Sequence, residues 1–531
     1  LIYFILLPTF AITLLCLGTW FRWRYKNKRL LLMASKIPGP PVVPLFGNAL
    51  KFMCRSEDLT IIIKDILQEY GDIFRFWLGP DLNIVVNNPD DLKTLLTSSK
   101  TSIKGPQYKY MADILGGGIL SGSGSVWRKH RKIATPNYAK RSVECYTGIF
   151  NKETDYLIEN LQKVPNGHEI NIYKFIIKCT TMAVCRMYFE TVMFYNLTYL
   201  IDSFTHFFYR LYEIIFNRMT KWYLQIDPIF WITNSYKTQK HFMELMPTFA
   251  KYIIDIRKSK LNIKENFVLE YSEKNMEEAI HLSAVDRFLL SKELSTQELI
   301  QEIFTLFTSS QEASGKICSY LLLMMAFHPK YQEKLYTEIN EVIGDKDKPL
   351  TEEDFKQMPY LEMVYKEVLR LFPIGAMIQR TVQTDIHISK NNNNQRIFIF
   401  TIILSIFVLN KLIFLRPNII DNYLFWFNRV GFYLKNIFIT ETCTIPAGSS
   451  LVIPIYHIQR DERFWINPND FDPERFNPEN TRHRPPYSYI PFSLGPMDCL
   501  GIFLIFSFCF NYCLMLNILP NRSCKDFLWF P

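Results

Sequence analysis

The residue pattern with the clearest chemical meaning is Phe492-Ser-Leu-Gly495-Pro-Met-Asp-Cys499-Leu-Gly501. Its spacing, F-x-x-G-x-x-x-C-x-G, arises by chance in a chain of this composition on the order of once in a thousand. A Cys thiolate can ligate haem iron and push electron density towards O–O bond cleavage. The glycines would let the backbone approach a flat macrocycle with no Cβ atom in the way, and a helix beginning just after Cys499 would favour the thiolate. Among the eleven cysteines, this spacing marks Cys499 as a metal ligand in preference to an inert buried thiol.

Two further pairs of residues lie at helical spacing. Trp127 and Arg131 are four residues apart and share one helix face. An indole N–H beside a guanidinium suits an anionic group such as a carboxylate, with an ordinary surface helix as the alternative. Glu367 and Arg370 are three residues apart; taken alone, such a pair is a surface ion pair worth a few tenths of a kcal/mol.

A third group of polar residues, Ser309-Ser-Gln-Glu312, lies in an apolar context. A carboxylate in the middle of a core is costly unless something uses it. Glu312 is therefore either a functional acid or a residue on a solvent-exposed helix face, and the sequence favours neither.

These residues need elements to position them. Residues 58–300 are predicted to be mostly helical, with short strands such as Leu82–Val86. The clearest helix begins at Ser295 with the capping box S-T-Q-E and runs to Phe327, before His-Pro. At about 1.5 Å per residue it could cross an entire domain.

Composition and charge narrow the class of protein. Of 531 residues, 48% are hydrophobic and 21% charged, which fits neither a disordered chain nor a typical multi-span transporter. The net charge of +9 is spread without a basic tract, so we expect an acidic partner or anionic lipid and no nucleic acid. The cysteines lack regular spacing and any CxxC pair, which favours reduced, cytosol-facing thiols over a secreted disulfide framework.

The N-terminal segment is predicted to be a membrane anchor. Residues 1–21 hold an uncharged apolar run long enough to span a bilayer, and five basic residues follow from Arg22 to Arg29. By the positive-inside rule the body then faces the cytosol. Residues 22–50 add the proline-rich Lys36-Ile-Pro-Gly-Pro-Pro41, a stiff, non-helical hinge.

The chain resembles the cytochromes P-450. The resemblance rests on these features in order along the chain: the anchor, the hinge, Trp127–Arg131, the long helix, Glu367-x-x-Arg370, Phe471-Asp-Pro-Glu-Arg-Phe476 and the cysteine loop. The resemblance is to the microsomal fourth family, many of whose members hydroxylate fatty acids and related lipids, and it covers nearly the whole chain. It implies a mainly α cytochrome P-450 fold with a smaller β-rich part, preceded by one N-terminal transmembrane helix.

The resemblance also implies an activity. The chain would be a haem-thiolate monooxygenase of the endoplasmic reticulum membrane, with its catalytic domain on the cytosolic side. It would insert one atom of O2 into a small apolar, lipid-like substrate, using electrons from NADPH through NADPH-cytochrome reductase. The implied site residues are Cys499 as axial ligand of haem iron; Phe492, Gly495 and Gly501 around it; Trp127, Arg131 and Arg380 at the haem propionates; Glu367, Arg370 and Arg475 as a buried triad; and Glu312 as the distal acid.

Two single residues depart from the family pattern. The Thr that normally follows the distal acid is Ala313 here. Ser314 is rotated 100° around the helix, so Ser309, one turn earlier on the same face, is the better substitute hydroxyl. The Arg normally found two residues before the Cys is Met497, which removes a charge-assisted hydrogen bond worth about 1.5–3 kcal/mol.

Two segments of the chain also depart from the family pattern. Residues 51–388 and 442–501 would form the catalytic domain, with 442–501 binding haem, and residues 389–441 would be an insertion of about fifty residues. We interpret this segment as translated intron in preference to a second membrane contact; a single crossing there would place Cys499 on the lumenal side. After Gly501 the expected amphipathic helix is predicted to be missing, because residues 502–531 begin with a run that is apolar all round.

Two alternatives to an active enzyme follow. One is a catalytically defective or mis-spliced product without stable haem. The other is a multi-span membrane protein, which only the two late apolar stretches suggest and which the ordered motifs of residues 36–388 disfavour.

Overall fold

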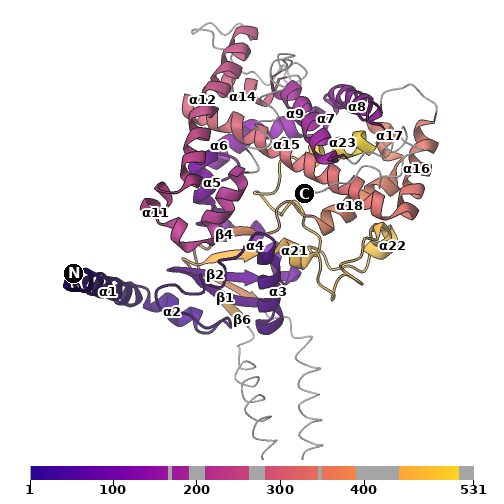
Figure 1. The fold of residues 1–531 in the computed structure, drawn as a ribbon. Coiled ribbons are helices and arrows are strands. Elements are labelled where there is room, and N and C mark those ends of the chain that lie inside the picture. The colour runs from indigo at the N-terminus through magenta and orange to yellow at the C-terminus, as the bar shows by residue number, and fades with distance from the viewer. Residues whose placement is uncertain are drawn as a thin grey trace, which may run out of the picture.

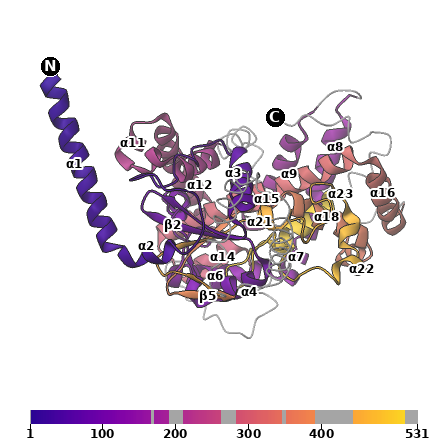
Figure 2. The ribbon, with the colours of Figure 1, turned by 90° about the horizontal axis from the view of Figure 1, so that it is seen from below.

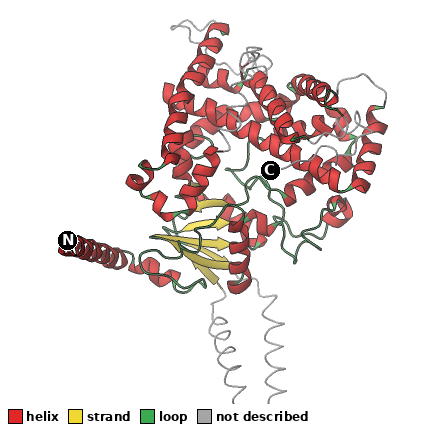
Figure 3. Cartoon of the chain, in the orientation of Figure 1, coloured by secondary structure: helices red, strands yellow, loops and turns green. Residues whose placement is uncertain are grey.

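Helices build most of the molecule, and its strands gather at one end, close to the N-terminal helices (Figures 1 and 3). The computed structural model describes residues 2–165, 170–189, 210–261, 282–344, 350–389 and 442–513. The helices outside the N-terminal segment are α3 (Asp58–Tyr70), α4 (Pro89–Thr97), α5 (Tyr108–Leu115), α6 (Gly124–Ala134), α7 (Lys140–Glu144), α8 (Thr147–Gln162), α9 (Ile172–Phe189), α11 (Asp227–Trp231), α12 (Asn234–Lys260), α14 (Ala284–Ser291), α15 (Thr296–Phe327), α16 (Pro329–Ile343), α17 (Glu352–Lys356), α18 (Pro359–Leu371), α21 (Ile455–Ile458), α22 (Pro478–Thr481) and α23 (Ile502–Cys513).

The N-terminal segment forms two helices, α1 (Ile2–Lys26) and α2 (Lys28–Ala34). In both views α1 projects away from the body (Figures 1 and 2). The segment is helical, but among the described residues no helix is long and apolar enough to cross a bilayer, so the predicted transmembrane helix is not found. The hinge is non-helical, as predicted, and it is held against the body because the Arg75 N–H donates to the Pro38 carbonyl at 2.8 Å.

The main sheet joins strands from both ends of the chain. Its order is β1-β2-β7-β4-β3, and β5 and β6 form a separate hairpin. The predicted strand at Leu82–Val86 is confirmed within β2. The bounds are β1 (Ile73–Leu78), β2 (Asp81–Val86), β3 (Ile103–Lys104), β4 (Ile378–Thr381), β5 (Ile386–Ser389), β6 (Thr442–Ile445) and β7 (Ser450–Ile453).

The long helix α15 begins and ends where the sequence predicts. The Ser295 side chain accepts from the Glu298 N–H while the Glu298 carboxylate accepts from the Ser295 N–H, so the capping box is complete. Twenty residues of α15 are buried, because it packs against α9, α12, α18 and α23 in the main hydrophobic core. This helix is the central support of the body.

The structure places a helix directly after the cysteine loop, where the sequence predicts that the amphipathic helix of the family is missing. Residues Ile502–Cys513 form α23, which packs on α8, α15 and α18. Its aromatic side chains reach two of these neighbours, α8 and α18: Phe508 lies 4.5 Å from Phe150 and Phe506 lies 5.5 Å from Tyr365, between ring centroids. An apolar helix of this kind is stable here because most of its side chains, though not Phe503, are buried against these neighbours. Residues 514–531 lie outside the described part.

The predicted insertion begins and ends in one hairpin. Strands β5 and β6 pair antiparallel, and their outermost Cα partners are Ser389 and Thr442. Residues 390–441, including the apolar run 397–409, lie outside the described residues. The pairing of β5 with β6 places the described residues on either side of this segment in one folded body.

We propose that residues 390–441 can be removed without loss of the fold. Joining Ser389 to Thr442 through Asn-Gly, the usual two-residue hairpin turn, should leave the melting temperature within about 2 °C, because Ile386, Ile388, Cys443 and Ile445 keep their buried contacts.

A matched control deletes 388–443 instead, which also removes two buried side chains and should lower stability by a few kcal/mol. Circular dichroism melts of both variants measure the difference. If both deletions destabilise equally, the removed segment contributes to the folded body.

Candidate functional site

The cysteine loop is closed by its own backbone. The Cys499 N–H donates to the Phe492 carbonyl at 3.0 Å, and the Asp498 N–H donates to the Gly495 carbonyl at 3.1 Å. Gly495 has φ +81°, and a Cβ atom there would meet the Leu96 carbonyl oxygen at 2.5 Å. Glycine at 495 is therefore required by the turn and by close packing against the end of α4.

The thiol of Cys499 lies next to the start of α23. The Gly501 N–H donates to Sγ at 3.3 Å. Solvent reaches Cys499, yet desolvation by the surrounding protein raises its pKa, and Asp498 raises it further. The Gly501 hydrogen bond, Arg131 and Lys104 oppose this and lower the pKa. A helix start therefore lies beside the cysteine, and Cys499 is a solvent-exposed residue.

Arg131 reaches the cysteine loop from α6. Its Nη2 atom donates to Asp498 Oδ1 and its Nη1 atom donates to the Asp498 carbonyl, each at 2.6 Å. Trp127 lies one turn earlier on the same helix, as predicted. The helix therefore presents a cation directly beside the cysteine.

A second cation, Lys104, was not predicted. It is the register partner of Arg380 across β3 and β4, so the two side chains lie on the same face of the sheet. Burial, followed by repulsion from Arg380 and Arg131, lowers the pKa of Lys104 to about 7, whereas Cys499 raises it. No motif signals Lys104, because only strand pairing brings it to Arg380.

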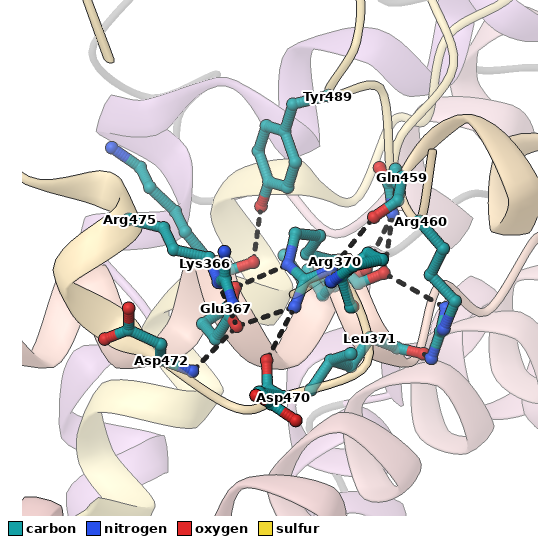
Figure 4. Close-up of polar contacts among 12 residues, drawn as sticks. Lys366, Glu367, Arg370, Leu371, Gln459, Arg460, Asp470, Asp472, Arg475 and Tyr489 are labelled. Carbon is teal, nitrogen blue, oxygen red and sulfur yellow. Dashed lines mark hydrogen bonds and ion pairs between the residues drawn. The ribbon is translucent and has the colours of Figure 1, made fainter. Parts of the chain in front are cut away.

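Glu367 and Arg370 form a buried pair on α18, and neither side chain is exposed. All five N–H donors of Arg370 have acceptors (Figure 4). Two donate to Glu367 at 2.6 and 2.8 Å, and the others donate to the backbone carbonyls of Gln459, Pro468 and Asp470. The surface-pair alternative is therefore wrong for this position.

The pair extends towards the cysteine loop. Arg475 Nε lies 3.4 Å from Glu367 Oε1, which also accepts from the Asp472 N–H at 2.9 Å. Gln459, another residue without a sequence signal, donates to the Leu369 and Arg370 carbonyls and accepts from the Ile490 N–H at 3.1 Å. Since Ile490 lies two residues before Phe492, this network connects α18 to the start of the loop.

Glu312 is buried in α15, and both carboxylate oxygens have partners. Lys316 Nζ lies 2.6 Å from Oε1, and the Tyr173 hydroxyl donates to Oε2 at 3.2 Å. Burial and the Glu312 charge raise the pKa of Tyr173. The structure thus decides against the solvent-exposed alternative. The half-exposed Lys316 connects this carboxylate to the surface.

The two serine hydroxyls near Ala313, those of Ser309 and Ser314, differ in their hydrogen bonds. Ser309 donates to the Thr305 carbonyl of its own helix at 2.6 Å and can still accept a hydrogen bond. Ser314 is fully buried, and its hydroxyl has no hydrogen-bond partner among the described residues. Neither the Ser309 nor the Ser314 hydroxyl touches the Glu312 carboxylate within hydrogen-bond distance in the described part of the chain.

The residues present fit haem. The exposed Cys499 stands at a helix start, and burial, followed by repulsion from Arg380 and Arg131, lowers the pKa of the neighbouring Lys104. Such a cluster suits a dianionic group, and haem carries two propionates beside an iron that accepts a thiolate. The arrangement defines a haem-thiolate class of site.

Comparison with known proteins also supports a haem-thiolate site. The cytochrome P450 family model matches residues 37–395 and 433–504. Human cytochrome P450 4V2 is 27% identical over 470 residues, covering 86% of this chain and 78% of the relative. Cytochrome P450 4c3 of Drosophila melanogaster is 26% identical over 493 residues, covering 90% and 82% respectively.

The chain belongs to the cytochrome P450 family. It is a haem-thiolate monooxygenase, and the mainly helical fold with a small sheet is the fold predicted from the sequence. Its partners as a class are a redox-partner reductase, a substrate and O2. The family match omits residues 396–432, within the predicted insertion, and stops three residues into α23.

Proposed function

We propose that Cys499 is the axial ligand and that the enzyme takes electrons from NADPH through NADPH-cytochrome reductase to hydroxylate an apolar, lipid-like substrate. The observation that carries the proposal is the accessible Cys499 thiol at the start of α23, beside a cluster of cations. The lipid-like substrate rests on the similarity to fourth-family P450s.

Different residues of the chain would hold different parts of the haem. When bound, haem would supply O2 activation, and Cys499 would hold its iron as a thiolate ligand. Trp127, Arg131, Arg380 and the additional Lys104 would bind the propionates. Phe492, Gly495 and Gly501 shape the loop that presents the thiolate. Glu367, Arg370 and Arg475 would keep this loop in place.

Glu312 would deliver protons on the opposite side of the site. Its contacts with Tyr173 and Lys316 form a short path from a half-exposed ammonium to a buried carboxylate. Ala313 provides no hydroxyl to pass the proton on. We therefore expect poor coupling: reconstituted with reductase, the enzyme should oxidise NADPH and release more hydrogen peroxide than hydroxylated product.

Ala313→Thr should shift the ratio of peroxide to product towards product by several-fold, because the new hydroxyl lies beside Glu312. Ser309→Ala is the matched variant one turn earlier. If Ser309 already provides the hydroxyl, the serine variant alone should uncouple turnover further. If the ratio of peroxide to product is unchanged in both variants, Glu312 has a structural role and does not deliver protons.

Membrane association is supported by an apolar surface near α1. Residues 42–53 and the region of α11 meet where Phe46 and Trp222 contact each other, 4.9 Å apart between ring centroids. Exposed apolar patches of this kind mark interaction surfaces. The exposed members are Val42, Val43, Leu45, Leu50, Met53, Ile226, Ile229, Trp231 and Ile232. We propose that this apolar surface and α1 hold the enzyme on the cytosolic side of the endoplasmic reticulum membrane.

A photo-crosslinking amino acid in place of Ile232 should therefore attach to lipid when the full chain is reconstituted in vesicles. Ile466 is the matched control, since it is equally exposed, at 81% against 82%, but lies outside the apolar surface. Mass spectrometry of the crosslinked protein measures the yield. Equal lipid yields at both positions would contradict the proposed membrane surface.

The alternative function, a product that does not keep haem, is favoured by one observation. Met497 removes a propionate partner, and the remaining Arg131 already contacts Asp498. Purified protein with less than stoichiometric haem after reconstitution would support it.

A further inference from the structure

Asp498 directly precedes Cys499 and contacts the cation that the proposed function assigns to a haem propionate. Its carboxylate accepts from Arg131 Nη2 and its carbonyl accepts from Arg131 Nη1, both at 2.6 Å. Both terminal nitrogens of the Arg131 guanidinium, Nη1 and Nη2, therefore already donate to Asp498. A guanidinium binds a carboxylate most strongly through two parallel N–H donors.

The contact is held by the loop itself. The hydrogen bonds from the Asp498 N–H to Gly495 and from the Cys499 N–H to Phe492 limit how far Asp498 can move while Cys499 stays in place. The Asp498 side chain is 39% exposed and that of Arg131 is 18% exposed, so solvent screens the pair only in part. A propionate must share Arg131 with Asp498 or displace its carboxylate.

The charges around Asp498 indicate that its carboxylate competes with a haem propionate for Arg131 and does not help to bind the propionate. A thiolate and two propionates would bring three negative charges to Lys104, Arg131 and Arg380. Asp498 adds a fourth negative charge next to the thiolate, and Met497 adds no cation. Like charges at such short range repel one another.

We propose that Asp498 is an internal counter-ion that competes with a haem propionate for Arg131 and so weakens haem retention in this enzyme. The inference rests on the proposed role of Arg131 at a propionate.

The test uses the full-length haem-loaded protein and measures the rate at which haem transfers to excess apomyoglobin. Asp498→Asn should slow haem loss about tenfold, because the charged competitor is gone while the size is kept. Asp498→Glu keeps the charge and should stay close to the unmodified enzyme. In an Arg131→Gln background, Asp498→Asn should have no effect, because the shared partner is absent. Loading with haem dimethyl ester, which has no propionate charge, should likewise remove the effect.

The outcomes separate the two proposals. If Arg131→Gln leaves haem loss unchanged, Arg131 is not a propionate partner and both proposals about it fail. If Arg131→Gln speeds haem loss but Asp498→Asn does not slow it, only the competition is overturned. Faster haem loss in Asp498→Asn would show that Asp498 positions Arg131. A slowing that persists with the dimethyl ester would show that Asp498 acts on the thiolate instead.

Discussion

Cys499→Ala should abolish the red-shifted thiolate band of the ferrous–carbonyl spectrum, the largest effect we expect from any single substitution. Only a thiolate ligand produces this band, and Cys499 is the exposed cysteine at the start of α23. Alanine leaves space but no ligand, so haem content should also fall. Difference spectra of reduced, carbon monoxide-treated protein measure both.

Cys145→Ala is the control for this experiment. Cys145 is also exposed, but it follows α7 and has its own contact with the Arg141 carbonyl. This variant should keep the full thiolate band. A band that survives in Cys499→Ala, or disappears in Cys145→Ala, would refute the assignment of Cys499.

Glu367→Ala and Arg370→Ala should each prevent recovery of folded, haem-loaded protein. Removing one member of a fully buried pair leaves the other charge uncompensated, at a cost of about 3–5 kcal/mol. That cost is a large fraction of the stability of an ordinary domain. Loss of Arg370 would also free three backbone carbonyls of the segment that leads to the cysteine loop.

The same helix offers a matched control. Glu362 and Lys366 form an ion pair 2.7 Å apart on the exposed face of α18, with about two fifths of each side chain exposed. Glu362→Ala should therefore cost less than about 1 kcal/mol. The yield of folded, haem-loaded protein is compared for all three variants, and chemical denaturation measures the stability of each variant that is recovered. Equal, small losses in all of them would mean that the buried pair contributes no more than a surface bridge.

Local sequence was sufficient for the features that local forces control. The capping box set the start of α15 because Ser295 and Glu298 satisfy each other's backbone N–H groups without help from distant residues. The cysteine loop was recognised from spacing alone, since its hydrogen bonds join residues at most seven apart. Family resemblance added the partner Arg475, which no local pattern connects to Glu367.

Tertiary structure decided everything that depends on burial or on contacts between distant segments. Lys104 and Arg380 are 276 positions apart and meet only through the pairing of β3 with β4. Glu312 allowed two interpretations and the helix after Gly501 was predicted to be missing, because a sequence does not state which helix faces neighbours will cover. The contact of Arg131 with Asp498 likewise required α6 to pack beside the cysteine loop. Residue types and spacing determined what chemistry this protein can do, whereas packing determined which charges meet at the site, because electrostatic energies depend on distance and on exclusion of water.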